Sequence, residues 1–217
     1  MSLRNSIILV ILSICYMFVL RIINTVFPIL AFDINWIIIR LILTIISFMI
    51  FIIFLLQFIR EYIPENNNSL LNSSIAVFIG TLALLIINIS NGLSPILPVF
   101  LYNNQSGSYF NNMVIWIYAF VINIFIFNIY LLIESRDNRQ LKKYTIWAMA
   151  GASALFLLRS INMLNYFYYF QSKEKFLDLN NGSLTGVGIL LVLFSFITIL
   201  LFLINLRKSL PADPVIS

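Results

Sequence analysis

The sequence contains no histidine and a single cysteine, and each shortage excludes a class of chemistry. Without histidine there is no usual haem ligand, no common zinc ligand and no Ser–His dyad of an intramembrane hydrolase. The one cysteine, Cys15, has no partner for an intrachain disulfide, so thiol–disulfide relays and Cys-ligated clusters are excluded as well. We therefore expect no metal, no cofactor and no enzyme activity.

Charged residues are also scarce. They make up 10% of the 217 residues, whereas hydrophobic residues make up 61%. A soluble domain is closer to ~45–50% apolar and about 25% charged. Most of the chain is therefore expected to lie in lipid, which leaves no room for a separate soluble domain. The net charge of +5 is scattered over short segments between apolar runs, a pattern typical of membrane topology that does not indicate nucleic-acid binding.

Acidic residues are absent from the interior of every long apolar run. All eight lie in expected turns, loops or the tail: Asp33, Glu61, Glu65, Glu134, Asp137, Glu174, Asp178 and Asp213. This placement argues against paired-aspartate intramembrane proteolysis and against a proton or sodium relay built on buried carboxylates. The chain has no Walker motif either.

Six apolar runs, each long enough to cross a bilayer, predict the fold class: an all-α, polytopic integral membrane protein that forms a single helical bundle. The runs lie at residues 6–30, 35–59, 70–89, 113–133, 147–170 and 183–206. A signal peptide is the competing interpretation of the first run, but this run is too long and no A-x-A-like cleavage site follows it. The connection Ser90–Asn112 contains an apolar, proline-bearing stretch, Pro95–Tyr102, which is either a re-entrant segment or a loop in the headgroup layer.

Basic residues between the runs predict the orientation. If both termini are cytoplasmic, eight basic residues flank the spans on that side, and only Lys173 and Lys175 lie outside. The eight are Arg4, Arg60, Arg136, Arg139, Lys142, Lys143, Arg207 and Lys208. Such a bias follows the positive-inside rule, so we expect both ends inside and a location in the cytoplasmic (inner) membrane of a prokaryote.

Three arginines lie within the predicted spans. Arg21 is followed by Asn24 and Arg159 by Asn162, while Arg40 lies early in the second run. A guanidinium in hydrocarbon costs at least ~2.5–3.5 kcal/mol. At a rise of about 1.5 Å per residue, Arg40 lies roughly 9–10 Å below the outer turn, and the other two arginines a few ångströms deeper. We expect these five residues to bind an anionic group in the outer half of the membrane: a lipid phosphate, a carboxylate or an inorganic anion.

A structural role for the same arginines is the alternative. Arg40 lies on roughly the same helix face as Asp33 and can extend its long side chain towards the outer surface. Arg21 and Arg159 can hydrogen-bond to neighbouring polar groups and lock helices together. The fifth run also contains two small-residue pairs, Ala148/Ala152 and Ala150/Ala154, which favour close helix packing.

Two functions are compatible with these observations. The first is a membrane transport or channel component with the arginine-lined site described above. The second is a non-catalytic membrane subunit or sensor that acts by assembling with a partner protein, with the arginines as structural locks or lipid anchors. Both imply membrane lipids as partners and either a homo-oligomer or a protein partner in a membrane complex, and neither involves nucleic acid.

Overall fold

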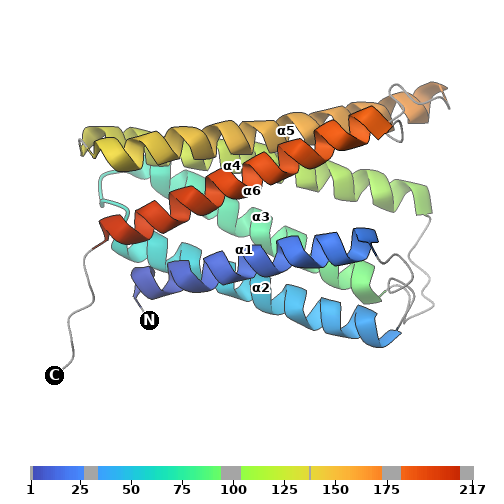
Figure 1. Cartoon of the computed structure of the whole chain (residues 1–217), viewed down its shortest axis with the longest axis horizontal. Helices are drawn as coiled ribbons and strands as arrows, with labels where there is room; N and C mark the ends of the chain where they lie inside the picture. The colour runs from blue at the N-terminus through green and yellow to red at the C-terminus, as the bar shows by residue number, and fades with distance from the viewer. Residues whose placement is uncertain (1, 27–33, 94–103, 137, 173–181, 211–217) are drawn as a thin grey trace. The chain divides into compact units, whose positions relative to one another are not determined.

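The computed structural model describes residues 2–26, 34–93, 104–136, 138–172 and 182–210, and every regular element in these ranges is an α-helix (Figure 1). The helices are α1 (Leu3–Val26), α2 (Ile34–Glu61), α3 (Asn68–Leu93), α4 (Asn104–Ser135), α5 (Arg139–Ser172) and α6 (Gly182–Ser209). All six are long and apolar enough to cross a membrane. In lipid a helix satisfies its backbone polar groups internally, so six such helices indicate a multi-pass integral membrane protein. The prediction of an all-α chain with six apolar helices is confirmed.

Several helices extend beyond the predicted apolar runs. α5 begins eight residues earlier than its run, at Arg139, and only residues 136–138 separate it from α4. The predicted connection Ser90–Asn112 is shorter than expected, because α3 continues to Leu93 and α4 already begins at Asn104. A helix does not stop where hydrocarbon ends, since its hydrogen bonds continue until a cap or a breaker intervenes. The proposed re-entrant stretch, Pro95–Tyr102, lies outside the described residues.

Asparagine side chains cap two of the helices. The Asn67 carboxamide oxygen accepts a hydrogen bond from the backbone N–H of Leu70 at the start of α3, at 3.0 Å. Asn138 accepts one from the N–H of Leu141 at the start of α5, also at 3.0 Å. Each cap satisfies one of the N–H groups that the first turn of a helix leaves without an intrahelical partner. These two asparagines therefore define where α3 and α5 begin.

Replacing Asn67 by alanine is expected to lower the free energy of unfolding by about 0.5–2 kcal/mol, because the Leu70 N–H loses its acceptor. The matched control is Asn66→Ala at the neighbouring exposed position, whose side chain makes no hydrogen bond with the described residues. Thermal unfolding of the purified variants in one detergent measures both changes. Equal losses in the two variants would show that the cap contributes nothing specific.

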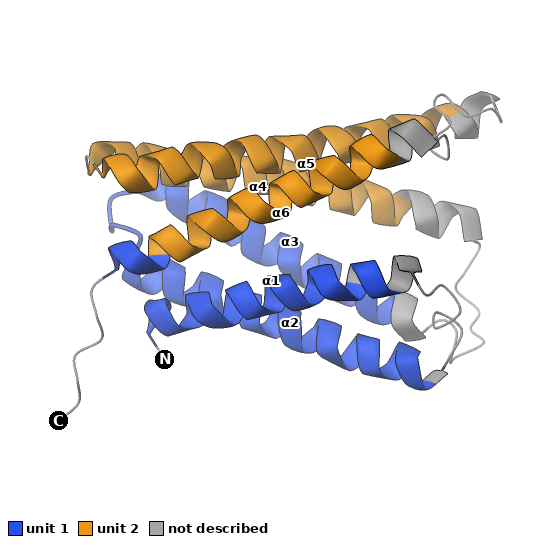
Figure 2. Cartoon of the chain, in the orientation of Figure 1, with its two compact units in different colours: residues 1–102, 207–217 blue, residues 103–206 orange. Residues whose placement is uncertain are grey.

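The chain divides into two compact units (Figure 2). Unit 1 comprises residues 1–102 together with the end of the chain from Arg207, and unit 2 comprises residues 103–206. Unit 1 therefore contains α1, α2 and α3 with the last turn of α6, and unit 2 contains α4, α5 and the rest of α6. We describe each unit by itself.

In unit 1, two hydrogen bonds align α1 with α2. The Ser13 hydroxyl on α1 donates to the backbone carbonyl of Ser47 on α2 at 3.4 Å. Near the start of α1, the N–H of Leu3 donates to the Glu61 carboxylate at the end of α2, at 2.9 Å. Four aromatic rings follow one another along α2 at centroid distances of 4.9–5.9 Å: Phe51, Phe54, Phe58 and Tyr62. The two helices are thus antiparallel neighbours over most of their length.

In unit 2, α5 packs against both α4 and α6. The Asn123 carboxamide of α4 donates to the Ala152 carbonyl at 3.2 Å and accepts from the Ser153 hydroxyl at 3.0 Å. On the α6 side of α5, the Ser195 hydroxyl of α6 donates a hydrogen bond to the backbone carbonyl of Gly151. Polar side chains that bond across helices and small residues that allow close approach are the usual means of packing in lipid. The predicted small-residue stretch of α5 therefore meets helices of its own unit.

Candidate functional site

The five predicted site residues are divided between the two units. Arg21, Asn24 and Arg40 belong to unit 1, whereas Arg159 and Asn162 belong to unit 2. The side chains of Arg21 and Asn24 lie outside the described part of the structure, as does Asp33, the suggested partner of Arg40. Convergence of all five residues on one ligand stays a prediction. The described residues do define the surroundings of the arginines within each unit.

Arg40 lies on the buried face of α2. Ile37, Thr44 and Ser47 are buried on this helix and are separated from Arg40 by three, four and seven residues. At 3.6 residues per turn, these spacings place all four residues on one side of the helix. Arg40 itself is half-buried and makes no hydrogen bond or ion pair with any described residue. The guanidinium thus continues a stripe of hydroxyl-bearing side chains that faces into unit 1.

The contact between Ser13 and Ser47 fixes which residues of α1 and α2 lie at the same depth. In an antiparallel pair, moving seven residues towards the end of α1 matches moving seven residues towards the start of α2. These steps lead from Ser13 to Leu20 and from Ser47 to Arg40, each over a length of about 10.5 Å. The backbone of Arg21 therefore lies close to the level of Arg40.

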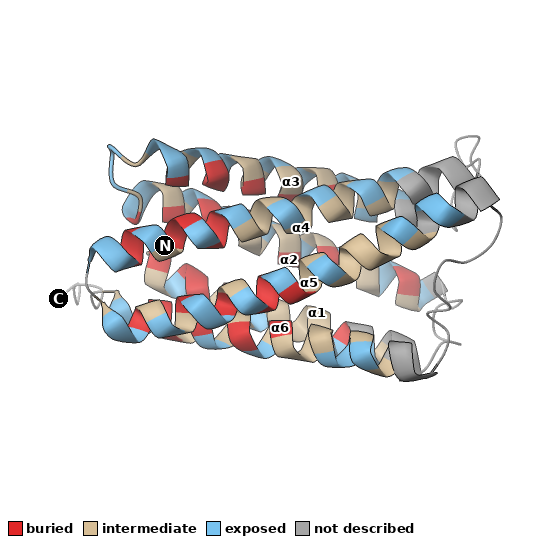
Figure 3. Cartoon of the chain, turned by 90° about the horizontal axis from the view of Figure 1, so that it is seen from above, coloured by how far each residue is buried: buried red, intermediate tan, exposed pale blue. Residues whose placement is uncertain are grey.

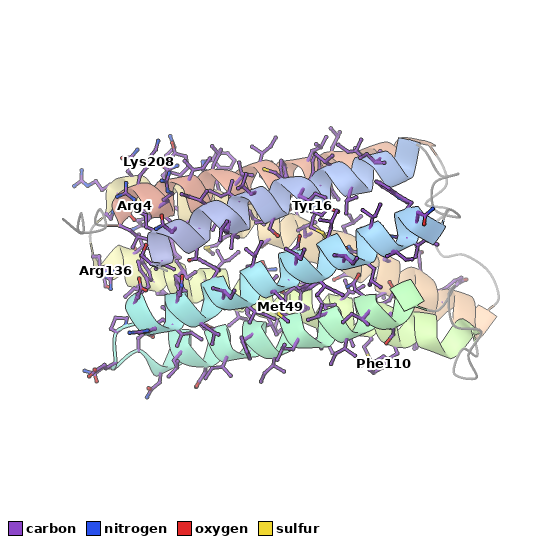
Figure 4. All side chains as sticks on the ribbon, turned by 90° about the horizontal axis from the view of Figure 1, so that it is seen from below. Arg4, Tyr16, Met49, Phe110, Arg136 and Lys208 are labelled. Atoms are coloured by element: carbon purple, nitrogen blue, oxygen red, sulfur yellow. The ribbon has the colours of Figure 1, made fainter. Side chains whose placement is uncertain are left out.

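A third polar group belongs to the same region of α1. The hydroxyl oxygen of Tyr16 is buried and has no hydrogen-bond partner among the described residues. By the same register, Tyr16 lies level with Thr44, about one helical turn from Arg40. Figure 4 shows Tyr16 in the middle part of its helix. A buried hydroxyl in an apolar environment is costly unless it finds a hydrogen-bond partner.

In unit 2, Arg159 and Asn162 lie in the part of the helices where burial is sparse. The buried residues of α5 end at Ala154, those of α6 begin only at Ser195, and those of α4 begin at Phe125 (Figure 3). The half of unit 2 that lies away from the α4–α5 turn therefore contains no buried residue among those described. Arg159 and Asn162, in this half, are both partly exposed.

The neighbour of Arg159 joins α5 to α4. The indole N–H of Trp116 donates to the Ser160 hydroxyl at 2.9 Å, and the Trp116 ring stacks on Phe156 at a centroid distance of 5.8 Å. These contacts hold the α5 backbone beside α4 at the level of Arg159. The position of the Arg159 backbone is therefore set by packing, and the residue is partly exposed.

Two elements of this region were not predicted. The hydroxyls of Thr44 and Ser47 were detectable, because they follow Arg40 at spacings of four and three residues on a helix. The relevance of Tyr16 was not detectable, since its level relative to Arg40 depends on the register of two helices. Of the two predicted small-residue pairs, Ala148, Ala152 and Ala154 are buried, whereas Ala150 is exposed.

No family model, no curated protein and no solved structure matches this chain. The function must therefore be inferred from the helices and side chains themselves.

Proposed function

We propose that the protein is a membrane transport or channel component that binds an anion or an anionic lipid headgroup through arginines within its helices. The observation that carries the proposal is Arg40, a half-buried guanidinium on the inward face of an apolar helix, without a hydrogen bond or ion pair to any described residue. Its neighbours on that face, Thr44 and Ser47, are themselves buried.

The physical argument rests on the cost of such a cation. An arginine at the centre of an apolar helix is unfavourable by ~2.5–3.5 kcal/mol or more, and by less near a helix end, where Arg40 lies. Because the guanidinium stays charged, an acceptor of its hydrogen bonds offsets this cost. Carboxylates and phosphates accept two parallel hydrogen bonds from a guanidinium. The unpartnered Tyr16 hydroxyl, one turn away along the helix pair, offers a further donor for the same acceptor. The Arg21 backbone lies at this level too.

Binding by Arg40 can be tested with simple anions. We expect inorganic phosphate, acetate or chloride to raise the unfolding temperature of the purified protein, with one of them effective at the lowest concentration. In Arg40→Gln the apparent affinity for that anion should fall roughly tenfold or more, because at least one charge-assisted hydrogen bond is lost. Anion flux into proteoliposomes that contain the protein should fall in parallel.

The matched control is Arg139→Gln, which removes the same charge from an exposed position at the start of α5. It should leave both binding and flux unchanged. Arg159→Gln serves as a third variant: loss of the same binding would assign the arginine of unit 2 to the same site. A folded Arg40→Gln protein with wild-type binding and flux would refute the proposal and favour a subunit or sensor function.

The alternative subunit function has less support from the small-residue face of α5. The carbonyls of Gly151 and Ala152 accept hydrogen bonds from α6 and α4 of the same unit, so this face is occupied within the chain. Assembly with a partner protein would have to use other surfaces. The proposal includes no catalytic step, and it retains cytoplasmic termini and a prokaryotic plasma membrane as its setting, on the basis of the basic flanking residues.

A further inference from the structure

The opposite end of unit 1 carries a cluster of four cations. Arg4 lies in the first turn of α1, Arg60 in the last turn of α2, and Arg207 and Lys208 in the last turn of α6. All four belong to unit 1, and Figure 4 shows Arg4 and Lys208 at the same end of it. We call these four residues the basic cluster.

Two atoms of the basic cluster are inaccessible to water. The Nε atoms of Arg4 and Arg207 are buried, and neither has a hydrogen-bond partner among the described residues. An arginine that only marks the cytoplasmic side of a helix extends its whole guanidinium into water, which then satisfies every N–H group. Here a donor of each arginine is withdrawn from water and meets no acceptor among the described residues. A buried donor of this kind requires a partner.

The described acidic residues at this end, Glu61 and Glu65, do not supply that partner. One oxygen of the Glu61 carboxylate accepts the backbone N–H of Leu3, and Glu65 is exposed in the connection between α2 and α3. No member of the basic cluster forms an ion pair with a described residue. By contrast, Lys142 of unit 2 is paired with Glu134 at 2.6 Å. Among the described residues at this end of unit 1, four cations therefore stand against two carboxylates, Glu61 and Glu65.

We propose that the basic cluster binds a phosphate group, with Arg4 and Arg207 each donating from Nε and the phosphate supplied by the headgroup of an anionic phospholipid. A phosphate has several acceptor oxygens and matches the planar fork of arginine. The cluster lies at the ends of three apolar helices, which is the depth at which lipid headgroups are found. This inference does not depend on the proposed anion site near Arg40, which lies six residues into α2 at the other end of that helix.

The test compares lipids and free phosphate on the full chain in a neutral detergent. Phosphatidylglycerol is expected to raise the unfolding temperature of the wild type, whereas phosphatidylcholine raises it less. In the Arg4→Gln/Arg207→Gln variant the apparent affinity for phosphatidylglycerol should be roughly tenfold or more weaker. Inorganic phosphate distinguishes the source: protection at equal concentration assigns the site to a soluble phosphate, and protection by the lipid alone assigns it to the headgroup.

The charge-matched control is Arg139→Gln/Lys143→Gln, which removes two exposed cations from unit 2 and should retain wild-type lipid affinity. If the Arg4→Gln/Arg207→Gln variant does not fold, Arg207→Lys keeps the charge but removes the Nε donor and should also weaken binding. The proposal is overturned if phosphatidylglycerol protects no better than phosphatidylcholine. It is equally overturned if the control variant loses as much affinity, or if Arg207→Lys binds like the wild type.

Discussion

Gly151→Ala is expected to destabilise unit 2. A Cβ at this position would collide with the Thr198 hydroxyl and lie 3.1 Å from the Cα of Ser195. The Thr198 hydroxyl is held in place because it hydrogen-bonds to the backbone carbonyls of Phe194 and Ser195, each at 3.0 Å. The Ser195 atom that the new Cβ would approach belongs to the backbone of α6. The helices α5 and α6 must therefore move apart, which typically costs about 1–3 kcal/mol. Thermal unfolding in detergent measures the loss.

Gly186→Ala is the matched control for this prediction. It makes the same change in a helix, but a Cβ at position 186 meets no atom within 4 Å. Alanine favours helices over glycine by about 1 kcal/mol, so the control should be neutral or slightly stabilising. If Gly151→Ala were as stable as Gly186→Ala, the close approach of α5 and α6 at Gly151 would be refuted.

Arg40→Leu is expected to raise the free energy of unfolding while it abolishes anion binding. Arginine in a spanning helix is less favourable than leucine, by roughly 3 kcal/mol at the helix centre on insertion scales and by less near the helix end, where Arg40 lies and can reach water. When a ligand-binding residue lowers the stability of a protein, its replacement raises stability and lowers activity. Measurements of unfolding temperature without added anion, and of anion binding, test the two halves separately.

The competing structural role predicts the reverse result for stability. If Arg40 locks helices together through hydrogen bonds, its replacement by leucine removes them and lowers the unfolding temperature. Arg60→Leu, at the exposed end of the same helix, provides the reference for a change in charge and apolar surface alone. A stability loss in Arg40→Leu that exceeds the change in Arg60→Leu would identify Arg40 as a structural lock.

The helices were largely predictable, and their ends were not. Runs of twenty or more apolar residues have few stable alternatives in lipid, so each of the six runs corresponds to a helix. The early start of α5 depends on the Asn138 cap, and polar residues after the cap continue the helix without any hydropathy signal. Hydropathy likewise gave no sign that α4 begins at Asn104, within the stretch interpreted as a connection.

The candidate site was predictable in part. A charge inside an apolar run is visible in the sequence, so Arg40 and Arg159 were identified without a structure. The hydroxyl stripe next to Arg40 follows from helical spacing alone. The unpartnered hydroxyl of Tyr16 and the buried Nε atoms of Arg4 and Arg207 were not predictable, since burial of one atom depends on which helix covers it.

The sequence by itself determined that this protein is a set of six apolar helices with three arginines inside its predicted spans, because hydropathy and charge are properties of each segment alone. Only the tertiary structure decided that Ser13 meets Ser47, and so brings Arg40 level with the backbone of Arg21. It likewise decided that Gly151 meets Thr198. The physical reason is that apolar helices in lipid gain little from hiding hydrophobic surface, so their register depends on small residues and single hydrogen bonds between segments distant in the chain.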